Sequence, residues 1–239
     1  MNDKKLNIYL ILGLFFAAIT VTAESIGPKI VDVHLLLPFL KYLPFFNSRT
    51  LNISAGVILW PLVFILTDII SHYFGKKGVM QISYITVFLL IMVFSIYYMA
   101  SAMPPAKFWV EVNARNNNFN INQAYSLIFM QSTKIIFGSL IAFIASQIID
   151  ATIYHRLRAI TNEKLLWMRA LVSTFFSQLI DSYTVITIAF YIMGDWSLSQ
   201  IYEVGTSQFV FKLLIAVLLT PFLYIVHYVI DIYLGKEIS

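Results

Sequence analysis

Two copies of a polar motif lie inside apolar sequence and carry side chains that could bind a small polar ligand. Each copy reads Ser-Gln-hydrophobic-Ile-Asp, first at Ser146–Asp150 and again at Ser177–Asp181. On a helix the serine, the glutamine and the aspartate of each copy share one face, because the aspartate follows the serine by four residues. A carboxylate inside a membrane costs at least about 2.5 kcal/mol on insertion scales and usually faces the protein interior or a water-filled cavity. The two motifs therefore predict a polar site inside a membrane-embedded bundle.

The composition is that of an integral membrane protein. The chain is 59% hydrophobic and only 12% charged, whereas soluble domains carry about 25% charged residues. There is no cysteine, which excludes disulfides and thiolate chemistry, and the four histidines lack the spacing of metal ligands. We therefore expect no metal and no cofactor. We interpret the net charge of +4 through the distribution of basic residues between the loops and not as a nucleic-acid-binding surface. We therefore expect no nucleic-acid partner.

Membrane-spanning helices must position the two motifs. We predict an all-α integral membrane protein that forms a single domain over residues 1–239, with six spans of about 20 residues each. The predicted spans are 6–24, 52–72, 79–101, 129–154, 168–193 and 209–233. We expect the proline-containing loop 25–51 to lie on the surface or to fold in as a re-entrant lid, and a short interfacial helix to form around Phe108.

Basic residues in the loops indicate the orientation, because cytoplasmic loops are enriched in Lys and Arg. With the N-terminus inside, both short inner loops are basic, and the outer loop 194–207 has no basic residue. Both termini are thus predicted to be cytoplasmic. The inner basic residues are Lys4, Lys5, Lys76, Lys77, Arg156, Arg158, Lys164, Arg169 and Lys236, and the outer ones are Lys29, Lys41, Arg49, Lys107 and Arg115.

Three acids fall within the predicted spans. Asp68 and Asp150 are expected near cytoplasmic helix ends, where pairing with a nearby Arg or Lys is the simpler interpretation. Asp181 lies about 20 Å into its span, and no basic residue is within one turn of it. Asp181 is therefore predicted to contact a ligand or to take part in proton coupling.

The fifth predicted span carries a nearly continuous polar stripe, which suits a substrate path. For Gln147 and Gln178, hydrogen bonds that only join helices remain an alternative. Pro61 and Pro221 lie inside predicted spans and are expected to kink them. The residues of the stripe are Arg169, Ser173, Thr174, Ser177, Gln178 and Asp181.

Catalytic signatures are missing from the sequence. It contains no His-Glu-x-x-His, no Gly-x-Ser-x-Gly and no Walker loop. Paired aspartates could suggest an intramembrane protease, but the Gly-x-Gly-Asp motif of that family is absent. We therefore expect a protein that is not an enzyme.

Several motifs in a fixed order resemble the bacterial queuosine precursor transporters, also called the vitamin uptake transporter family. The resemblance extends from about Ser25 to the last span. It rests on Pro28-Lys29-Ile30, Ala55-Gly56-Val57, Pro61-Leu62, Leu66-Thr67-Asp68-Ile69, Tyr73-x-Gly75-Lys76-Lys77, Ser146-Gln147-x-x-Asp150, Trp167-x-Arg169, Ser173-Thr174-x-x-Ser177-Gln178-x-x-Asp181 and Thr220-Pro221-x-x-Tyr224. His72 departs from the family, which usually has an acid at this position.

The resemblance implies an importer of 7-cyano-7-deazaguanine and 7-aminomethyl-7-deazaguanine in the bacterial inner membrane, with six helices comparable to energy-coupling-factor substrate-binding subunits. The alternative is a binding subunit for a vitamin-like molecule that needs a separate ATPase module. Whether the chain forms a homo-oligomer stays open. One carboxylate can accept hydrogen bonds from the N1–H and 2-amino groups of a deazaguanine together. The expected substrate-binding residues are Asp181, Gln178, Asp150, Gln147, Ser177, Asp68, Arg169, Thr220 and Tyr224.

Overall fold

The computed structural model describes residues 3–27, 29–32, 42, 52–113, 120–130, 133–161 and 165–235. Most of the predicted lid, with Pro28, Pro38 and Pro44, lies outside the described residues. The same holds for five of the basic residues used to predict the orientation: Lys41, Arg49, Arg115, Lys164 and Lys236.

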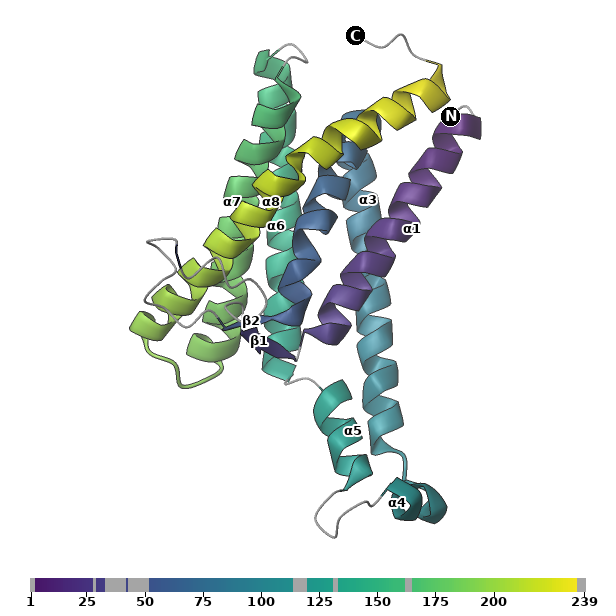
Figure 1. Cartoon of the computed structure of the whole chain (residues 1–239), viewed down its shortest axis with the longest axis vertical. Helices are drawn as coiled ribbons and strands as arrows, with labels where there is room; N and C mark the ends of the chain where they lie inside the picture. The colour runs from purple at the N-terminus through teal and green to yellow at the C-terminus, as the bar shows by residue number, and fades with distance from the viewer. Residues whose placement is uncertain are drawn as a thin grey trace.

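The described part of the chain is a helical bundle (Figure 1). Its helices are α1 (Asp3–Ile26), α3 (Trp60–Ala102), α4 (Lys107–Asn113), α5 (Ile121–Phe129), α6 (Thr133–Thr161), α7 (Leu166–Ile186) and α8 (Leu198–Leu234). Among the described residues, five helical runs are long and apolar enough to cross a membrane: 3–26, 55–102, 121–161, 166–192 and 198–234. The chain is thus an all-α membrane protein in class, and α4 confirms the short helix expected around Phe108.

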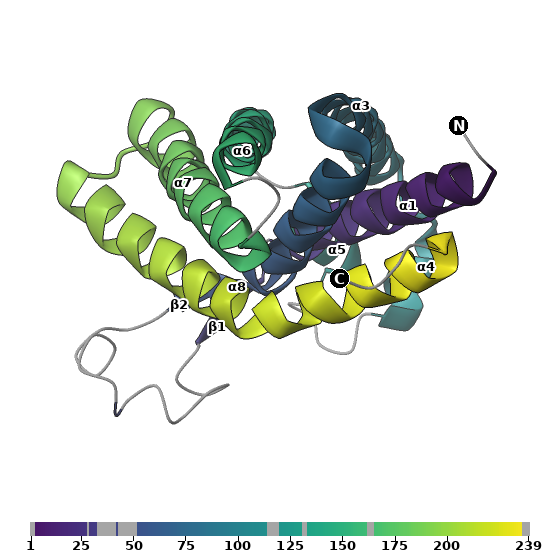
Figure 2. The same cartoon turned by 90° about the horizontal axis from the view of Figure 1, so that it is seen from above.

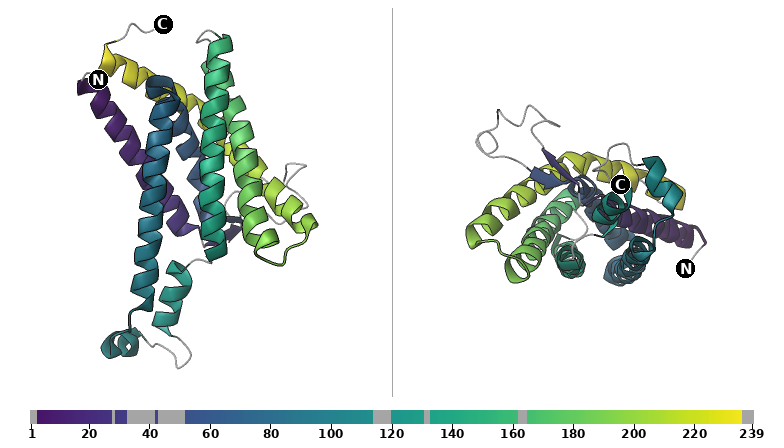
Figure 3. Two further views of the ribbon diagram at one scale, coloured as in Figure 1. Left: turned by 180° about the vertical axis from the view of Figure 1, so that it is seen from behind. Right: turned by 90° about the horizontal axis from the view of Figure 1, so that it is seen from below.

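Helix α3 is bent sharply at Gly75. This residue has φ 73° and ψ 177°, in the left-handed region that favours glycine because it lacks a Cβ atom. The halves of α3 on either side of the bend run in opposite directions, as Figure 1 and the left view of Figure 3 show. The predicted second and third spans, 52–72 and 79–101, fall on these two halves.

Pro61 does not kink a span, although the sequence analysis expected it to. Helix α3 begins at Trp60, so Pro61 occupies its first turn, where a backbone N–H has no helical partner to lose. The predicted start of the second span, residue 52, therefore precedes the start of the helix. Residues 55–58 instead form a 3₁₀ turn, which Ser54 caps by accepting from the Gly56 N–H at 3.2 Å.

Two short strands, β1 (Ile30–Asp32) and β2 (Asn52–Ser54), pair in antiparallel register with Val31 opposite Ile53. The all-α prediction missed them, because three residues are too few to show an alternating pattern. The pairing brings the 3₁₀ turn against the end of α1. A Cβ atom on Gly56 would lie 2.2 Å from the Ala23 carbonyl oxygen, so only glycine allows this close approach.

The start of α1 and the end of α8 lie at one end of the bundle, which also contains the bend of α3 (Figure 1). The Lys4 Nζ donates to the Tyr233 carbonyl at 3.4 Å, which joins the start of α1 to the end of α8. We call this the basic end, because its helix ends carry Lys4, Lys5, Lys76, Lys77, Arg156 and Arg158. Helices α4 and α5 extend from the opposite end.

Apolar side chains face outward and polar side chains face inward. Leu14, Phe88 and Leu218 are each at least 65% exposed, as expected of residues that contact lipid. Figure 2, which looks along the bundle, shows α6 and α7 side by side with α8 and α3 beside them. The buried polar residues lie mainly on α3, α6 and α7, and these helices position the site.

Candidate functional site

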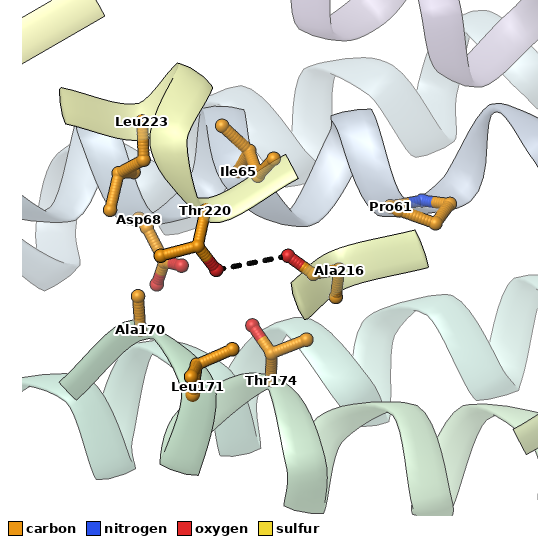
Figure 4. Close-up of a pocket in the computed structure, with 9 residues that line it drawn as sticks. All are labelled: Pro61, Ile65, Asp68, Ala170, Leu171, Thr174, Ala216, Thr220 and Leu223. Atoms are coloured by element: carbon orange, nitrogen blue, oxygen red, sulfur yellow. Dashed lines mark hydrogen bonds between the residues drawn. The ribbon is translucent and has the colours of Figure 1, made fainter. Parts of the chain in front are cut away.

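A small cavity lies between α3, α7 and α8, about halfway along α8 (Figure 4). Its polar lining consists of Asp68, Thr174 and Thr220. The Asp68 carboxylate and the Thr174 hydroxyl point toward the space between α7 and α8, and Thr220 donates to the Ala216 carbonyl at 3.1 Å. The cavity volume of about 10 Å³ is enough for about one water molecule. The cavity is therefore too small for a purine-sized ligand in this structure.

Two buried acids lie beside this cavity, each held by a serine of α7. Ser173 Oγ donates to Asp68 Oδ1 at 3.3 Å, and Ser177 Oγ donates to Asp150 Oδ1 at 3.0 Å. The carboxylates of Asp68 and Asp150 are close enough to interact electrostatically. Both residues are at most 1% exposed. Helices α3, α6 and α7 thus bring two acids from distant sequence positions into one polar layer.

Asp150 lies farther from the end of its helix than the predicted span implied. The fourth span was expected to end at residue 154, but α6 continues to Thr161, so Asp150 is about 16 Å from the helix end. Neither Asp68 nor Asp150 forms a salt bridge with a residue of the described segments. The simpler interpretation, an ion pair at the membrane surface, is therefore not what the structure shows for these two acids.

The two glutamines of the motifs lie in the same interior and retain free polar atoms. Gln147 Oε1 is 3.0 Å from the Thr67 hydroxyl, which is also 3.0 Å from the Val63 carbonyl. A hydroxyl has one proton, so Thr67 cannot donate to both oxygens at once. If Thr67 donates to the Val63 carbonyl, it can accept from the Gln147 side-chain amide with its O and N atoms exchanged. In either arrangement one polar atom of the Gln147 amide has no partner among the described residues. Gln178 is fully buried, and within the described segments neither its Nε2 nor its Oε1 has a hydrogen-bond partner.

Arg169 is the largest fully buried side chain, and all three of its guanidinium nitrogens lack a hydrogen-bond partner among the residues described. Its guanidinium carbon lies 5.4 Å from the centroid of the Tyr154 ring, a cation–π distance. Asp68 is near enough for electrostatic attraction, and Asp150 Oδ2 is likewise unpartnered within the described residues. An unpaired buried polar group costs about 1–3 kcal/mol, and a charged one costs more. So many free groups in one layer are typical of a ligand-binding or hydrated site.

Asp181 has a basic partner that the sequence analysis missed. Lys212 Nζ on α8 lies 2.6 Å from Asp181 Oδ2, and the two side chains are only 4% and 5% exposed. The cation comes from another helix and not from within one turn of Asp181 on the same helix. The signal that could have identified Lys212 is that it is the only Lys or Arg inside the predicted span 209–233.

The remaining predicted residues divide between the site and the surface. The polar stripe of α7 is buried along its whole length, from Arg169 to Asp181, as its spacing predicted. Thr220 lines the cavity, but Tyr224 is 45% exposed and is not part of the lining. Thr67, Tyr154 and Lys212 contribute to the polar interior but were not predicted.

Buried polar groups inside a bundle with an apolar outer surface mark a functional site in membrane proteins, such as a substrate or ion pathway. Residues 54–226 match the family described as "Putative vitamin uptake transporter". This match covers most of the chain, which therefore belongs to this family, and the resemblance inferred from the motifs is confirmed.

Two curated relatives carry the name "Probable queuosine precursor transporter". The protein of Haemophilus influenzae is 23% identical over 174 residues, which cover 72% of this chain and 67% of the relative. The protein of Bacillus subtilis is 24% identical over 176 residues, which cover 73% and 71%. No solved structure matches the chain.

Proposed function

We propose that this chain imports the queuosine precursors 7-cyano-7-deazaguanine and 7-aminomethyl-7-deazaguanine across the bacterial inner membrane, without a separate ATPase module. The names of the two relatives support the substrate class. The buried polar layer of α3, α6 and α7 supports it on chemical grounds. We further propose that the chain crosses the membrane six times, with α3 crossing twice, and that the basic end faces the cytoplasm.

The observation that carries the substrate proposal is the complementarity of the free polar atoms to a guanine-like base. A deazaguanine presents the N1–H and 2-amino donors side by side and the O6 acceptor next to them. Asp150 Oδ2 is a free acceptor, while Gln178 and Arg169 retain free donors. In our proposal Asp150 accepts from the donor edge, and the amide of Gln178 or the guanidinium of Arg169 donates to O6.

Asp68 and Thr220 line the cavity through which the base would enter this layer. Asp68 can pair with the ammonium group of the aminomethyl form, or balance Arg169 when the neutral cyano form is bound. Asp181 has a different role in this proposal, because its Oδ2 atom is engaged by Lys212. Asp150 is therefore the better candidate for reading the base.

Uptake by intact cells tests the proposal. The cells cannot make 7-cyano-7-deazaguanine and lack their own importer, and they express either the wild type or one variant. The test variant is Asp150→Asn. The control is Asp195→Asn, which makes the same change at an exposed loop residue. We expect uptake with the wild type and with Asp195→Asn. Uptake with Asp150→Asn should be lower by at least about tenfold, because the loss of one hydrogen bond to a charged group weakens binding by about this factor.

A competition arm tests the donor edge of the base. Excess unlabelled 7-aminomethyl-7-deazaguanine should block uptake, and a 7-deazapurine without the 2-amino group should not. Normal uptake by a well-expressed Asp150→Asn protein would remove the assigned role of Asp150. Absence of uptake by wild-type protein that is present in the membrane would contradict the proposed function.

A further inference from the structure

Helix α8 has a weak point beside the cavity. Pro221 lies inside the helix, where it removes one backbone hydrogen bond and favours bending. Ala216, Thr220 and Leu223, on either side of this proline, line the cavity. A bend at Pro221 would thus change the distance between α8 and α7 at the site.

A buried ion pair joins the half of α8 before Pro221 to α7. Lys212 Nζ is 2.6 Å from Asp181 Oδ2 on α7, in a buried setting, and 6.0 Å from the centroid of the Trp60 ring. Glu24 of α1, which accepts from Ser139 Oγ at 3.1 Å, is near enough to interact electrostatically with both charges of the pair. Separating Lys212 from Asp181 inside the protein would leave two unpaired buried charges, so the contact opens only when water can reach it.

Polar contacts of Tyr73 join the half of α8 after Pro221 to α3. The Tyr73 hydroxyl of α3 donates to Asp231 Oδ1 at 2.9 Å and is 3.0 Å from His227 Nδ1. The rings of Tyr73 and His227 stack with centroids 5.1 Å apart, and His72 meets His227 edge-on at 4.6 Å. This second contact lies next to the Gly75 bend, at the basic end of the bundle.

The cavity lies between these two contacts. Thr220 follows Lys212 by eight residues and precedes His227 by seven, which places it about 12 Å from one and about 10 Å from the other along the helix. The first contact therefore separates the cavity from the end that carries α4 and α5. The second contact separates it from the basic end.

We propose that Lys212 with Asp181, and Tyr73 with Asp231 and His227, are positioning residues of the transport cycle that close the cavity toward opposite sides of the membrane. Release of one contact at a time, with α8 bending at Pro221, opens the cavity to one side only. This inference deepens the proposed transport function, on which it rests, but it does not depend on which base is carried.

The absence of cysteine from the chain permits a direct test. Thr174→Cys places a single thiol in the cavity lining, where the native side chain is 4% exposed. A membrane-impermeant thiol reagent is applied to each side of vesicles that contain the full-length protein. We expect slow labelling from both sides when both contacts are intact.

Cutting each contact should expose the thiol to one side. When Lys212→Met is added to the Thr174→Cys protein, the labelling rate should rise at least tenfold from the side opposite the basic end only. When Tyr73→Phe is added instead, the rate should rise by as much from the basic end only. Lys134→Met on α6 and Tyr228→Phe on α8 change exposed residues of the same types, and neither should alter the rate. The double exchange Asp181→Lys with Lys212→Asp should restore slow labelling.

Unchanged labelling in the cut variants, or an equal rise from both sides, would overturn the proposal, and Thr220→Cys provides a second reporter for the same comparison. Fast labelling of the double exchange would overturn the role of the ion pair. The assay contains no substrate, so failure here is distinct from failure of the uptake experiment.

Discussion

Removal of either partner of the Lys212–Asp181 pair should destabilise the protein, and by unequal amounts. Breaking a buried ion pair by deleting one partner costs about 3–5 kcal/mol, because the other charge stays buried and uncompensated. Lys212→Met leaves Asp181 facing the nearby Glu24. We expect a loss near the upper end of this range, about 5 kcal/mol. Asp181→Asn leaves Lys212 attracted to Glu24, and we expect about 3 kcal/mol.

A double-mutant cycle measured by reversible unfolding in mixed micelles tests this expectation. The double variant Asp181→Asn with Lys212→Met buries no unpaired charge of the pair, so its loss should fall short of the sum of the single losses by at least about 2 kcal/mol. Lys134→Met, a lysine exposed on α6, serves as the control and should change the free energy of unfolding by less than about 0.5 kcal/mol. If the double variant lost as much free energy of unfolding as the two single variants together, the stabilising interaction between Lys212 and Asp181 would be refuted. A larger loss for Asp181→Asn than for Lys212→Met would refute the involvement of Glu24.

Three further predictions concern the bend, the polar layer and the outer surface. Gly75→Ala should lower the free energy of unfolding by about 1–3 kcal/mol in the same micelle assay, because alanine is strained at φ 73°; an unchanged value would contradict this account of the bend. Gln178→Leu should leave the free energy of unfolding unchanged or higher, because it removes an unpartnered buried amide, while cellular uptake falls by about tenfold, the value of one lost hydrogen bond; lower stability with normal uptake would show a structural role instead. Tyr224→Ala should not change uptake, because the side chain is 45% exposed and outside the cavity lining, and a strong loss would place Tyr224 in the substrate path.

Local patterns in the sequence were enough for the helices and for the buried stripe of α7. Apolar runs of about 20 residues are determined by the thickness of the bilayer. The spacing of Arg169, Ser173, Ser177 and Asp181 places them on one face, and the structure buries that face. The break between the predicted spans 52–72 and 79–101 is also present, as the bend of α3 at Gly75.

Contacts between distant segments could not be predicted in the same way. The pairing of Lys212 with Asp181 and the grouping of Asp68 with Asp150 depend on how helices pack, and no periodicity within one helix encodes that. The distance of Asp150 from its helix end was missed because α6 continues past the apolar run into Arg156 and Arg158. The hydropathy of a span therefore marks where a helix enters the membrane but not where the helix ends.

Uptake by the purified chain alone, reconstituted into proteoliposomes, tests the central claim most directly. We predict that vesicles with this protein accumulate labelled 7-cyano-7-deazaguanine above protein-free vesicles, and that Asp150→Asn reduces this accumulation by at least about tenfold. Accumulation only after an ATPase module is added would contradict a self-sufficient importer. No accumulation under either condition, by protein that unfolds cooperatively in micelles, would contradict the substrate.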